Sequence, residues 1–134
     1  MKTIKEFFSE NDLFAKHAGI ELLEVASGTA KASMMIQSYH FNGARTVHGG
    51  AIFTLADFVF AVASNSHGSL AMGINTSISF VKAATGGVLY AEAREQASNK
   101  KLASYQVNVT DETGEIVALF QGMVYRKNTP IIKS

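Results

Sequence analysis

The chain has 134 residues, of which 47% are hydrophobic and 17% charged, with no cysteine, no tryptophan and one proline. A chain of this length builds one core, so we expect residues 1–134 to form a single domain, and the lack of cysteine excludes thiolate nucleophiles, cysteine-ligated zinc and iron–sulfur clusters. Twelve Lys and Arg against eleven Asp and Glu leave a net charge of +1, which excludes the dense basic stripe of a nucleic-acid-binding protein.

The start of the chain predicts a short helix and a hairpin. Apolar residues at near-helical spacing predict an amphipathic helix over residues 3 to about 16; they are Ile4, Phe7, Phe8 and Phe14. Strand-like runs at 20–26 and 29–36 flank Ser27 and Gly28, a pair suited to a tight turn. The first dozen residues are acidic and contain no apolar segment, and the apolar run at 58–63 is too short to span a membrane. We therefore expect a cytoplasmic protein with no membrane partner.

Residues 51–63 predict a buried central helix. They are apolar on nearly every side of a helical wheel, and their length and alanine content favour helix over strand. A polar, irregular stretch at 37–50 precedes them, and Asn65, Ser66 and Gly68 are expected to end the helix.

The second half of the chain alternates apolar and polar residues with period two. This pattern predicts four strands, at 74–80, 88–96, 103–109 and 115–126. Strands joined by tight turns make an antiparallel sheet, so six strands wrapped around one helix give an α+β architecture. The outer face and the edges of such a sheet stay open, which predicts a dimer.

Asp57 is the clearest anomaly, a carboxylate in the middle of the most apolar segment. Thr54, Asp57 and Ser64 share one side of the helix and form a narrow polar stripe. Because an unpaired buried carboxylate is costly, this stripe is expected to face a cleft, a partner subunit or a cation. Two interpretations stay open. Asp57 pairs with a Lys or Arg across a dimer, or it is a catalytic acid, since perturbed carboxylates concentrate at active sites.

The segment Val47-His48-Gly49-Gly50 leads into the same helix. Glycines let a backbone approach a ligand closely, and the free N–H groups and the dipole of a helix N-terminus favour a developing negative charge. This is the geometry of an oxyanion site. The alternative is a tight loop that only enters a buried helix.

At this point the residues resemble a known family. The run NGARTVHGGAIFTLAD at 42–57, with NSHG at 65–68 and GINTSISF at 73–80, resembles the hotdog-fold acyl-CoA thioesterases of the phenylacetate-pathway (PaaI-like) type. The likeness extends from about residue 10 to residue 126. It implies a hotdog fold, in which a curved antiparallel sheet wraps around one long central helix. It also implies homodimers with one continuous sheet, further association into homotetramers, and active sites at the dimer interface.

The resemblance also implies roles for individual residues. Asp57 is the general base or nucleophile and lies opposite the backbone N–H of Gly49 from the other protomer, which donates to the thioester carbonyl. His48 supports the loop, and Asn42 orients the carbonyl or the attacking water. The substrate is an aromatic or short- to medium-chain acyl-CoA, whose coenzyme A is part of the substrate, so no separate cofactor is expected.

Further candidates touch the substrate without taking part in the chemistry. They are Gly50, Thr54, Asn75, Thr76, Ser77 and Lys82. Asn75 to Ser77 are equally well explained as ordinary polar strand residues. Lys82, Lys100 and Lys101 are candidate contacts of the coenzyme A phosphates, although most lysines near turns are simply solvated. The histidines show no metal-ligand spacing, so we expect no metal site.

Two rival functions stay open. His40-Phe41-Asn42-Gly43 resembles the His-Phe-Pro-Gly stretch of hotdog β-hydroxyacyl dehydratases, in which a histidine and a helix acid remove water. Here Asn42 replaces the proline and the helix acid is Asp57 rather than a glutamate. The other rival is a non-catalytic acyl-CoA-binding module, which has no need of a carboxylate beside an oxyanion site.

Overall fold

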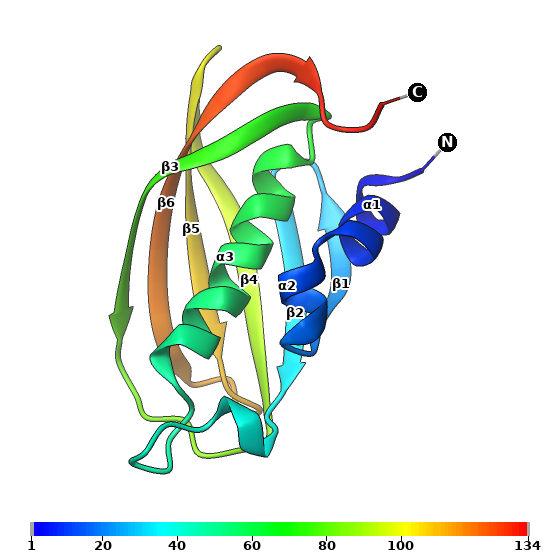
Figure 1. Ribbon diagram of the computed structural model, residues 1–134. Coiled ribbons are helices and arrows are strands. Elements are labelled where there is room, and N and C mark those ends of the chain that lie inside the picture. Colours follow the sequence, from blue (N-terminus) through cyan, green and yellow to red (C-terminus); the bar gives the residue numbers. More distant parts are fainter. Residues whose placement is uncertain (1, 134) are drawn as a thin grey trace.

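Six strands form one antiparallel sheet in the computed structural model, which describes residues 2–133 (Figure 1). The strands are β1 (Ile20–Ala26), β2 (Thr29–Met35), β3 (Ser69–Phe80), β4 (Val88–Ser98), β5 (Leu102–Thr110) and β6 (Ile116–Pro130). Their order in the sheet is β1-β2-β4-β5-β6-β3, so β1 and β3 are the two edges. The helices are α1 (Ile4–Asn11), α2 (Leu13–His17) and α3 (Gly49–Asn65), with a short 3-10 turn at Ser38–His40.

The long helix α3 lies across the concave face of the curved sheet, while α1 and α2 cover the β1 side (Figure 1). This arrangement confirms the predicted architecture. One face of α3 carries fully buried Leu55, Val59 and Val62, each contributing about 1.5–3 kcal/mol when removed from water. Phe60 packs against β6 where a Cβ on Gly122 would lie 2.6 Å from its ring, so glycine is needed at this position.

The period-two pattern predicted the buried face of β5 correctly. Its inward residues are fully or almost fully buried; they are Ala103, Tyr105, Val107 and Val109. The Gly28 turn also lies where predicted, with a positive φ of 76° that glycine adopts without strain. By contrast, β3 begins at Ser69 rather than at residue 74, and both of its faces are largely exposed because it is an edge strand.

The predicted N-terminal helix is divided in two at Asp12. Its backbone N–H donates to Phe8 O at the end of α1, and its side chain accepts from Ala15 N at the start of α2. Short polar side chains favour such caps over helix interiors. Phe14, one of the apolar residues on which the single amphipathic helix was predicted, lies in α2 and is 69% exposed. No helix within residues 2–133 is long and apolar enough to cross a membrane.

Candidate active site

The N-terminus of α3 presents an unused backbone amide at Gly49. His48 caps the helix, because its Nδ1 accepts a hydrogen bond from Gly50 N at 2.8 Å. Among residues 2–133 no acceptor lies within hydrogen-bond distance of the Gly49 N–H. The first N–H groups of a helix have no partner within the helix and carry the positive end of its dipole. Gly49 can therefore donate to an anionic oxygen.

The side chain of Phe80 lies close to the backbone of Gly49. A Cβ at this position would lie 3.1 Å from the Cζ of Phe80, the last residue of β3. The absence of a side chain thus lets the end of β3 approach the first turn of α3. The two segments, which are far apart in the sequence, form one corner of the molecule.

Asn42 shapes the loop that enters α3. Its Oδ1 accepts from Ala44 N at 2.9 Å and Thr46 N at 3.2 Å, and its Nδ2 donates to Thr46 Oγ1 at 2.9 Å. The turn also holds Arg45 at a positive φ of 63°. The side-chain carbonyl of Asn42 and one of its two amide hydrogens therefore form hydrogen bonds within the loop. The second amide hydrogen is left for a ligand.

A pocket of about 330 Å³ brings three of the predicted site residues together at this corner. Asn42, Gly49 and Lys82 line it, together with apolar side chains that include Ile52 and Phe80. Apolar walls with a few convergent polar groups are the usual composition of a small-molecule site.

Lys82 is already paired with two carboxylates. Its Nζ lies 2.7 Å from Asp111 Oδ2 and 2.6 Å from Glu115 Oε2. These hydrogen bonds raise the pKa of Lys82, and the lysine lowers the pKa of Asp111. A phosphate at Lys82 would have to compete with both carboxylates. The structure therefore favours a role for Lys82 in holding Asp111 and Glu115 over a role in binding the substrate.

Asp57 lies on the outer face of α3, exposed in the single chain, rather than in its core. Within residues 2–133 it forms no hydrogen bond and no ion pair. Desolvation by its surroundings, with a smaller contribution from the like charge of Asp12, raises the pKa of Asp57 above the ordinary range of an aspartate. The raised pKa makes the Asp57 carboxylate a stronger base than an ordinary aspartate, which suits a proton-accepting group.

The predicted polar stripe and the complete burial of α3 are only partly correct. Ser64 is buried and donates to Ala61 O at 3.1 Å, so it does not share the open face with Asp57. Gly50 is exposed on the same face of α3 as Asp57, and Thr54 is half-buried with its hydroxyl donating to Gly50 O at 2.7 Å. Serine hydroxyls bond readily to a preceding helix carbonyl, which removes the need for an external partner.

Asn75, Thr76 and Ser77 lie in the middle of the edge strand β3 and are all exposed. They do not line the pocket at Gly49, from which the end of β3 separates them. In the single chain they therefore belong to the open edge of the sheet rather than to the corner formed by Gly49 and Asn42.

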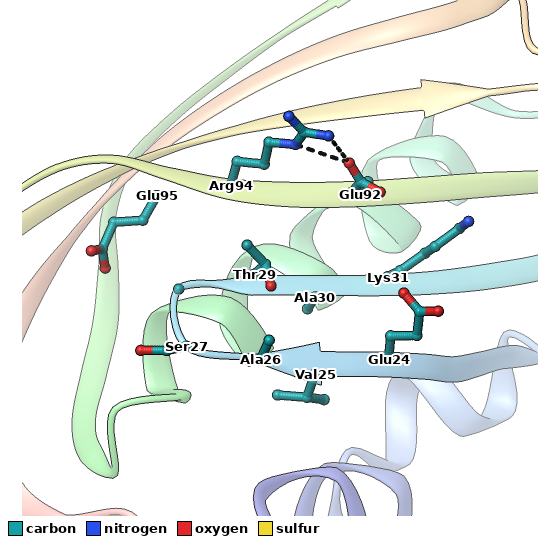
Figure 2. A pocket seen from close by; sticks show the side chains of 11 residues that line it. Glu24, Val25, Ala26, Ser27, Thr29, Ala30, Lys31, Glu92, Arg94 and Glu95 are labelled. Atoms are coloured by element: carbon teal, nitrogen blue, oxygen red, sulfur yellow. Dashed lines mark hydrogen bonds and ion pairs between the residues drawn. The ribbon is translucent and has the colours of Figure 1, made fainter.

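A larger hollow, of about 770 Å³, lies away from all of these residues. It follows the outer face of β1, β2 and β4, where Figure 2 shows Glu24, Lys31, Glu92 and Arg94. Arg94 already bonds Glu92 at 2.6 Å. Acidic and basic side chains that balance one another in this way are typical of a solvated sheet face. We therefore place the active site at the pocket beside Gly49, although its volume is smaller.

The histidine of the dehydratase-like segment is fully engaged within the fold. His40 is buried, its Nδ1 accepts from Gln37 N at 2.9 Å, and its Nε2 lies 2.7 Å from Ala18 O. Both ring nitrogens are thus used in holding the loop, which argues against a role in dehydration. Residues 2–133 contain no cluster of three or more His, Asp or Glu side chains that could hold a metal.

Sequence reasoning missed two groups of residues that the fold brings together. Phe80 was read only as a strand residue, because its contact with Gly49 joins segments that no local pattern connects. Arg126 and Lys127 were not linked to Lys100 and Lys101, although all four line one pocket. The pairing of Leu102 with Tyr125 brings them together, and such long-range register is not visible in periodicity.

Comparisons with known proteins identify relatives of the chain by sequence and by fold. The Thioesterase superfamily model matches residues 44–118. A protein of Archaeoglobus fulgidus named "Putative esterase" is 41% identical over 129 residues, covering 96% of this chain and 84% of that protein. The acyl-coenzyme A thioesterase PaaI of Escherichia coli is 34% identical over 118 residues, covering 87% of this chain and 84% of that protein. The solved structure of E. coli PaaI superposes with a TM-score of 0.89 at 33% identity, covering 92% of this chain and 91% of that one.

Proposed function

The chain belongs to the thioesterase superfamily, and on this basis we propose that it hydrolyses acyl-CoA thioesters to a free acid and coenzyme A. The acyl group is aromatic or of short to medium length. Gly49 donates its N–H to the thioester carbonyl, and Asp57 acts as general base or nucleophile.

One observation carries the proposal: neither the Gly49 N–H nor the Asp57 carboxylate has a partner within residues 2–133, yet the two groups are too far apart to act together in one chain. Gly49 and Asp57 are eight residues apart on α3, which is about 12 Å along the helix axis. A nucleophile and its carbonyl must approach to about 3–3.5 Å. A site that uses both groups therefore needs Gly49 from one protomer and Asp57 from its partner.

The edge strand β3 supplies a surface for such a pair. Its outer backbone groups are open to a further strand, and two copies related by a two-fold axis would extend the sheet from one protomer into the next. Several apolar residues at this edge are at least half exposed; they are Met72 (50%), Ile74 (56%), Phe80 (53%) and Val81 (59%). Burial of this edge favours a homodimer, while a homotetramer and a cytoplasmic location stay predictions.

The chemistry follows from where charge develops. Attack on the thioester carbon places negative charge on the carbonyl oxygen, which the Gly49 N–H and the helix dipole would stabilise by about 3–4 kcal/mol. Asp57 either takes a proton from water or attacks directly to form an anhydride that water then opens. In both routes the carbon–sulfur bond breaks and coenzyme A leaves as the thiolate.

The other candidates have supporting roles. His48 holds Gly50 N and thereby leaves the neighbouring Gly49 N–H to the substrate. The remaining amide hydrogen of Asn42 is placed to orient the carbonyl or the attacking water at the pocket wall. Gly50, Thr54 and the polar residues of β3 are proposed to line the cleft between two protomers.

The proposal is tested by thiol release from a panel of aromatic, short-chain and medium-chain acyl-CoA substrates. We expect turnover of at least one member and the loss of most turnover in Asp57→Asn, which keeps the size of the side chain. A variant that hydrolysed its best substrate at the parent rate would remove Asp57 from the mechanism. Binding of acyl-CoA without thiol release would favour the acyl-CoA-binding module.

Mixed oligomers test the shared site directly. Asp57→Asn and Gly49→Pro are each expected to be nearly inactive alone. A dimer that contains one chain of each kind has one site with both groups intact, so random mixing restores about a quarter of the parent activity. Matched mixtures of each variant with itself give no recovery. The same absence in the mixed sample would contradict a site shared between protomers.

A further inference from the structure

Three polar side chains meet beyond the end of α3 that is far from Gly49. Ser27 lies in the turn between β1 and β2, His67 lies two residues after the end of α3, and Glu95 lies on β4. Because α3 has 17 residues, its two ends are about 24 Å apart. Ser27, His67 and Glu95 are therefore remote from the corner at Gly49, and we call them the Ser27 cluster.

Hydrogen bonds join these side chains in a row. The Oγ of Ser27 lies 3.3 Å from His67 Nδ1, and His67 Nε2 lies 2.9 Å from Glu95 Oε1. An ionised carboxylate only accepts hydrogen bonds, so neutral His67 carries its proton on Nε2 and donates it to Glu95. The other ring nitrogen, Nδ1, is then an acceptor, and the Ser27 hydroxyl donates to it. Hydroxyl, base and carboxylate thus stand in the order that nucleophilic catalysis by serine requires.

Glu95 is fixed by two further groups. Its Oε1 also accepts a hydrogen bond from the hydroxyl of the fully buried Tyr105, and Arg126 pairs with the same oxygen at 3.1 Å. Burial alone would raise the pKa of Glu95, but hydrogen bonds from Tyr105 and His67 and the charge of Arg126 lower that pKa. The carboxylate is therefore held ionised in one position, where it orients the ring of His67 and can stabilise its charged form.

The turn presents Ser27 to solvent with an unused backbone N–H. Ser27 is exposed, and Gly28 follows it with a φ of 76°, so these two residues form a tight turn between the paired residues Ala26 and Thr29. Within residues 2–133 no acceptor lies within hydrogen-bond distance of the Ser27 N–H. The N–H of the nucleophilic serine is itself an oxyanion donor in the serine proteases. Ser27 therefore supplies a hydroxyl nucleophile and a donor for the anionic oxygen.

The Ser27 cluster borders the 770 Å³ hollow on the outer face of β1, β2 and β4. Ser27 and Glu95 lie at one end of it, and Lys31 lies toward the other end (Figure 2). The residues around Ser27 at this end are small; they are Ala26, Gly28 and Thr29. The hollow therefore leaves room for a small acyl group beside the hydroxyl of Ser27.

We propose that the Ser27 cluster is a second hydrolytic site that cleaves small carboxylic esters, with Ser27 as the nucleophile and His67 as the general base. Ser27 Oγ bonds to the ester carbon while its proton moves to His67 Nδ1. The ester carbon–oxygen bond then breaks, and the alcohol leaves with the proton from His67. Water attacks the acyl-serine in the same way, which releases the acid and returns the proton to Ser27. Glu95 acts through His67 and is a positioning residue. This activity is separate from the thioester hydrolysis proposed at Gly49.

The first test is covalent labelling with a fluorophosphonate, a probe for activated serines. Its phosphorus bonds to Ser27 Oγ, fluoride leaves, and the serine proton passes to His67. Mass spectrometry of the parent should find one adduct per chain, on the peptide that contains Ser27. Ser27→Ala should remove the adduct. His67→Gln, which keeps a polar side chain without a basic nitrogen, should slow labelling at least about 100-fold, the contribution of a positioned base.

The matched control is Ser9→Ala, which removes an exposed serine on α1 and should label at the parent rate. A folded parent protein without an adduct on Ser27 would overturn the inference. Labelling of His67→Gln at the parent rate would do the same, because it would show that the histidine does not activate the hydroxyl.

The second test separates the two sites by their substrates, p-nitrophenyl acetate and an acyl-CoA. Ser27→Ala should lower ester hydrolysis at least about 100-fold and leave thiol release unchanged. Asp57→Asn should do the reverse. Ester hydrolysis that Ser27→Ala retains and Asp57→Asn loses would belong to the site at Gly49 and would overturn the inference. A parent that cleaves the ester through Ser27 but releases no thiol would contradict only the proposed thioesterase function.

Glu95→Gln tests the positioning role, because the amide keeps the size of the side chain and loses its charge. The kcat for the ester should fall about tenfold or more with little change in KM. The fraction of chains that the fluorophosphonate finally labels should stay at the parent value, while the rate of labelling falls. A lower labelled fraction at the parent rate would show that Glu95 only supports the fold, and would remove it from the reaction.

Discussion

The replacement Gly49→Pro removes the hydrogen-bond donor on which the proposed mechanism depends. Gly49 is the first residue of α3, a position where proline is well tolerated because its N–H has no helical partner. His48 has φ −58° and ψ 134°, an extended conformation that suits the residue before a proline. No hydrogen bond to another residue is lost, since within residues 2–133 the Gly49 N–H has no acceptor.

The matched control is Gly49→Ala. Both variants add a Cβ that lies 3.1 Å from Phe80, but only alanine keeps the N–H, whose hydrogen proline replaces with the ring Cδ. Removal of one oxyanion donor costs about 10²–10³ in kcat, or about 2.7–4 kcal/mol of transition-state stabilisation. We therefore expect Gly49→Pro to be about 100- to 1,000-fold slower than Gly49→Ala at saturating substrate.

The assay is initial-rate thiol release for both variants, with urea denaturation as a control for folding. The free energies of unfolding should agree to within about 1 kcal/mol, because proline at a compatible site changes stability by no more than this. If the two variants are equally stable and have the same kcat, the Gly49 N–H does not stabilise the transition state.

Three further predictions concern stability and pH. Gly122→Ala should lower the free energy of unfolding by about 1–3 kcal/mol, measured by urea denaturation, because its Cβ would lie 2.6 Å from Phe60; Gly43→Ala, in open space, should not. The rate should fall as the pH drops through the raised pKa of Asp57, and Asp12→Asn, which removes a like charge, should move this limb of the pH–rate profile to lower pH. The raised pKa also means that ionised Asp57 destabilises the fold above that pKa. Asp57→Asn should therefore be more stable than the parent at neutral pH, with the difference lost once the pH falls below the pKa of an unfolded aspartate; equal stabilities at neutral pH would contradict this.

The elements of the fold could be predicted because their signals are local. The apolar segment at 51–63 and the alternation along β5 each report the face that an element buries, and the structure confirms both. The break at Asp12 was missed because a residue that caps two helices at once looks like one polar position within a helix. The exposure of β3 was missed because its place at the edge depends on strand order, which period-two alternation does not encode.

The candidate site was predictable to a smaller extent. Gly49 and Asp57 stand out by type, as glycine at a helix start and an acid in an apolar helix. Whether the side chains around them are free to bind substrate depends on tertiary contacts. Lys82 pairs with carboxylates about 30 positions later in the chain, and His40 bonds a carbonyl 22 positions earlier. No spacing rule reveals such partners, so the sequence overestimates the number of side chains that are free for substrate.

The outer face of α3 links the helix composition to the proposed mechanism. The sheet covers one side of α3, and the exposed positions Gly50 and Asp57 lie on the side that it leaves open. A partner protomer that covered this side would bury the remaining surface of an apolar helix and would also desolvate Asp57 further, raising its pKa beyond the value of the single chain. The same association would bring Asp57 to the Gly49 of the partner. Association of two protomers would then both bury the apolar surface of α3 and assemble the active site. The need for a catalytic acid at this interface explains why a carboxylate is present in so apolar a helix.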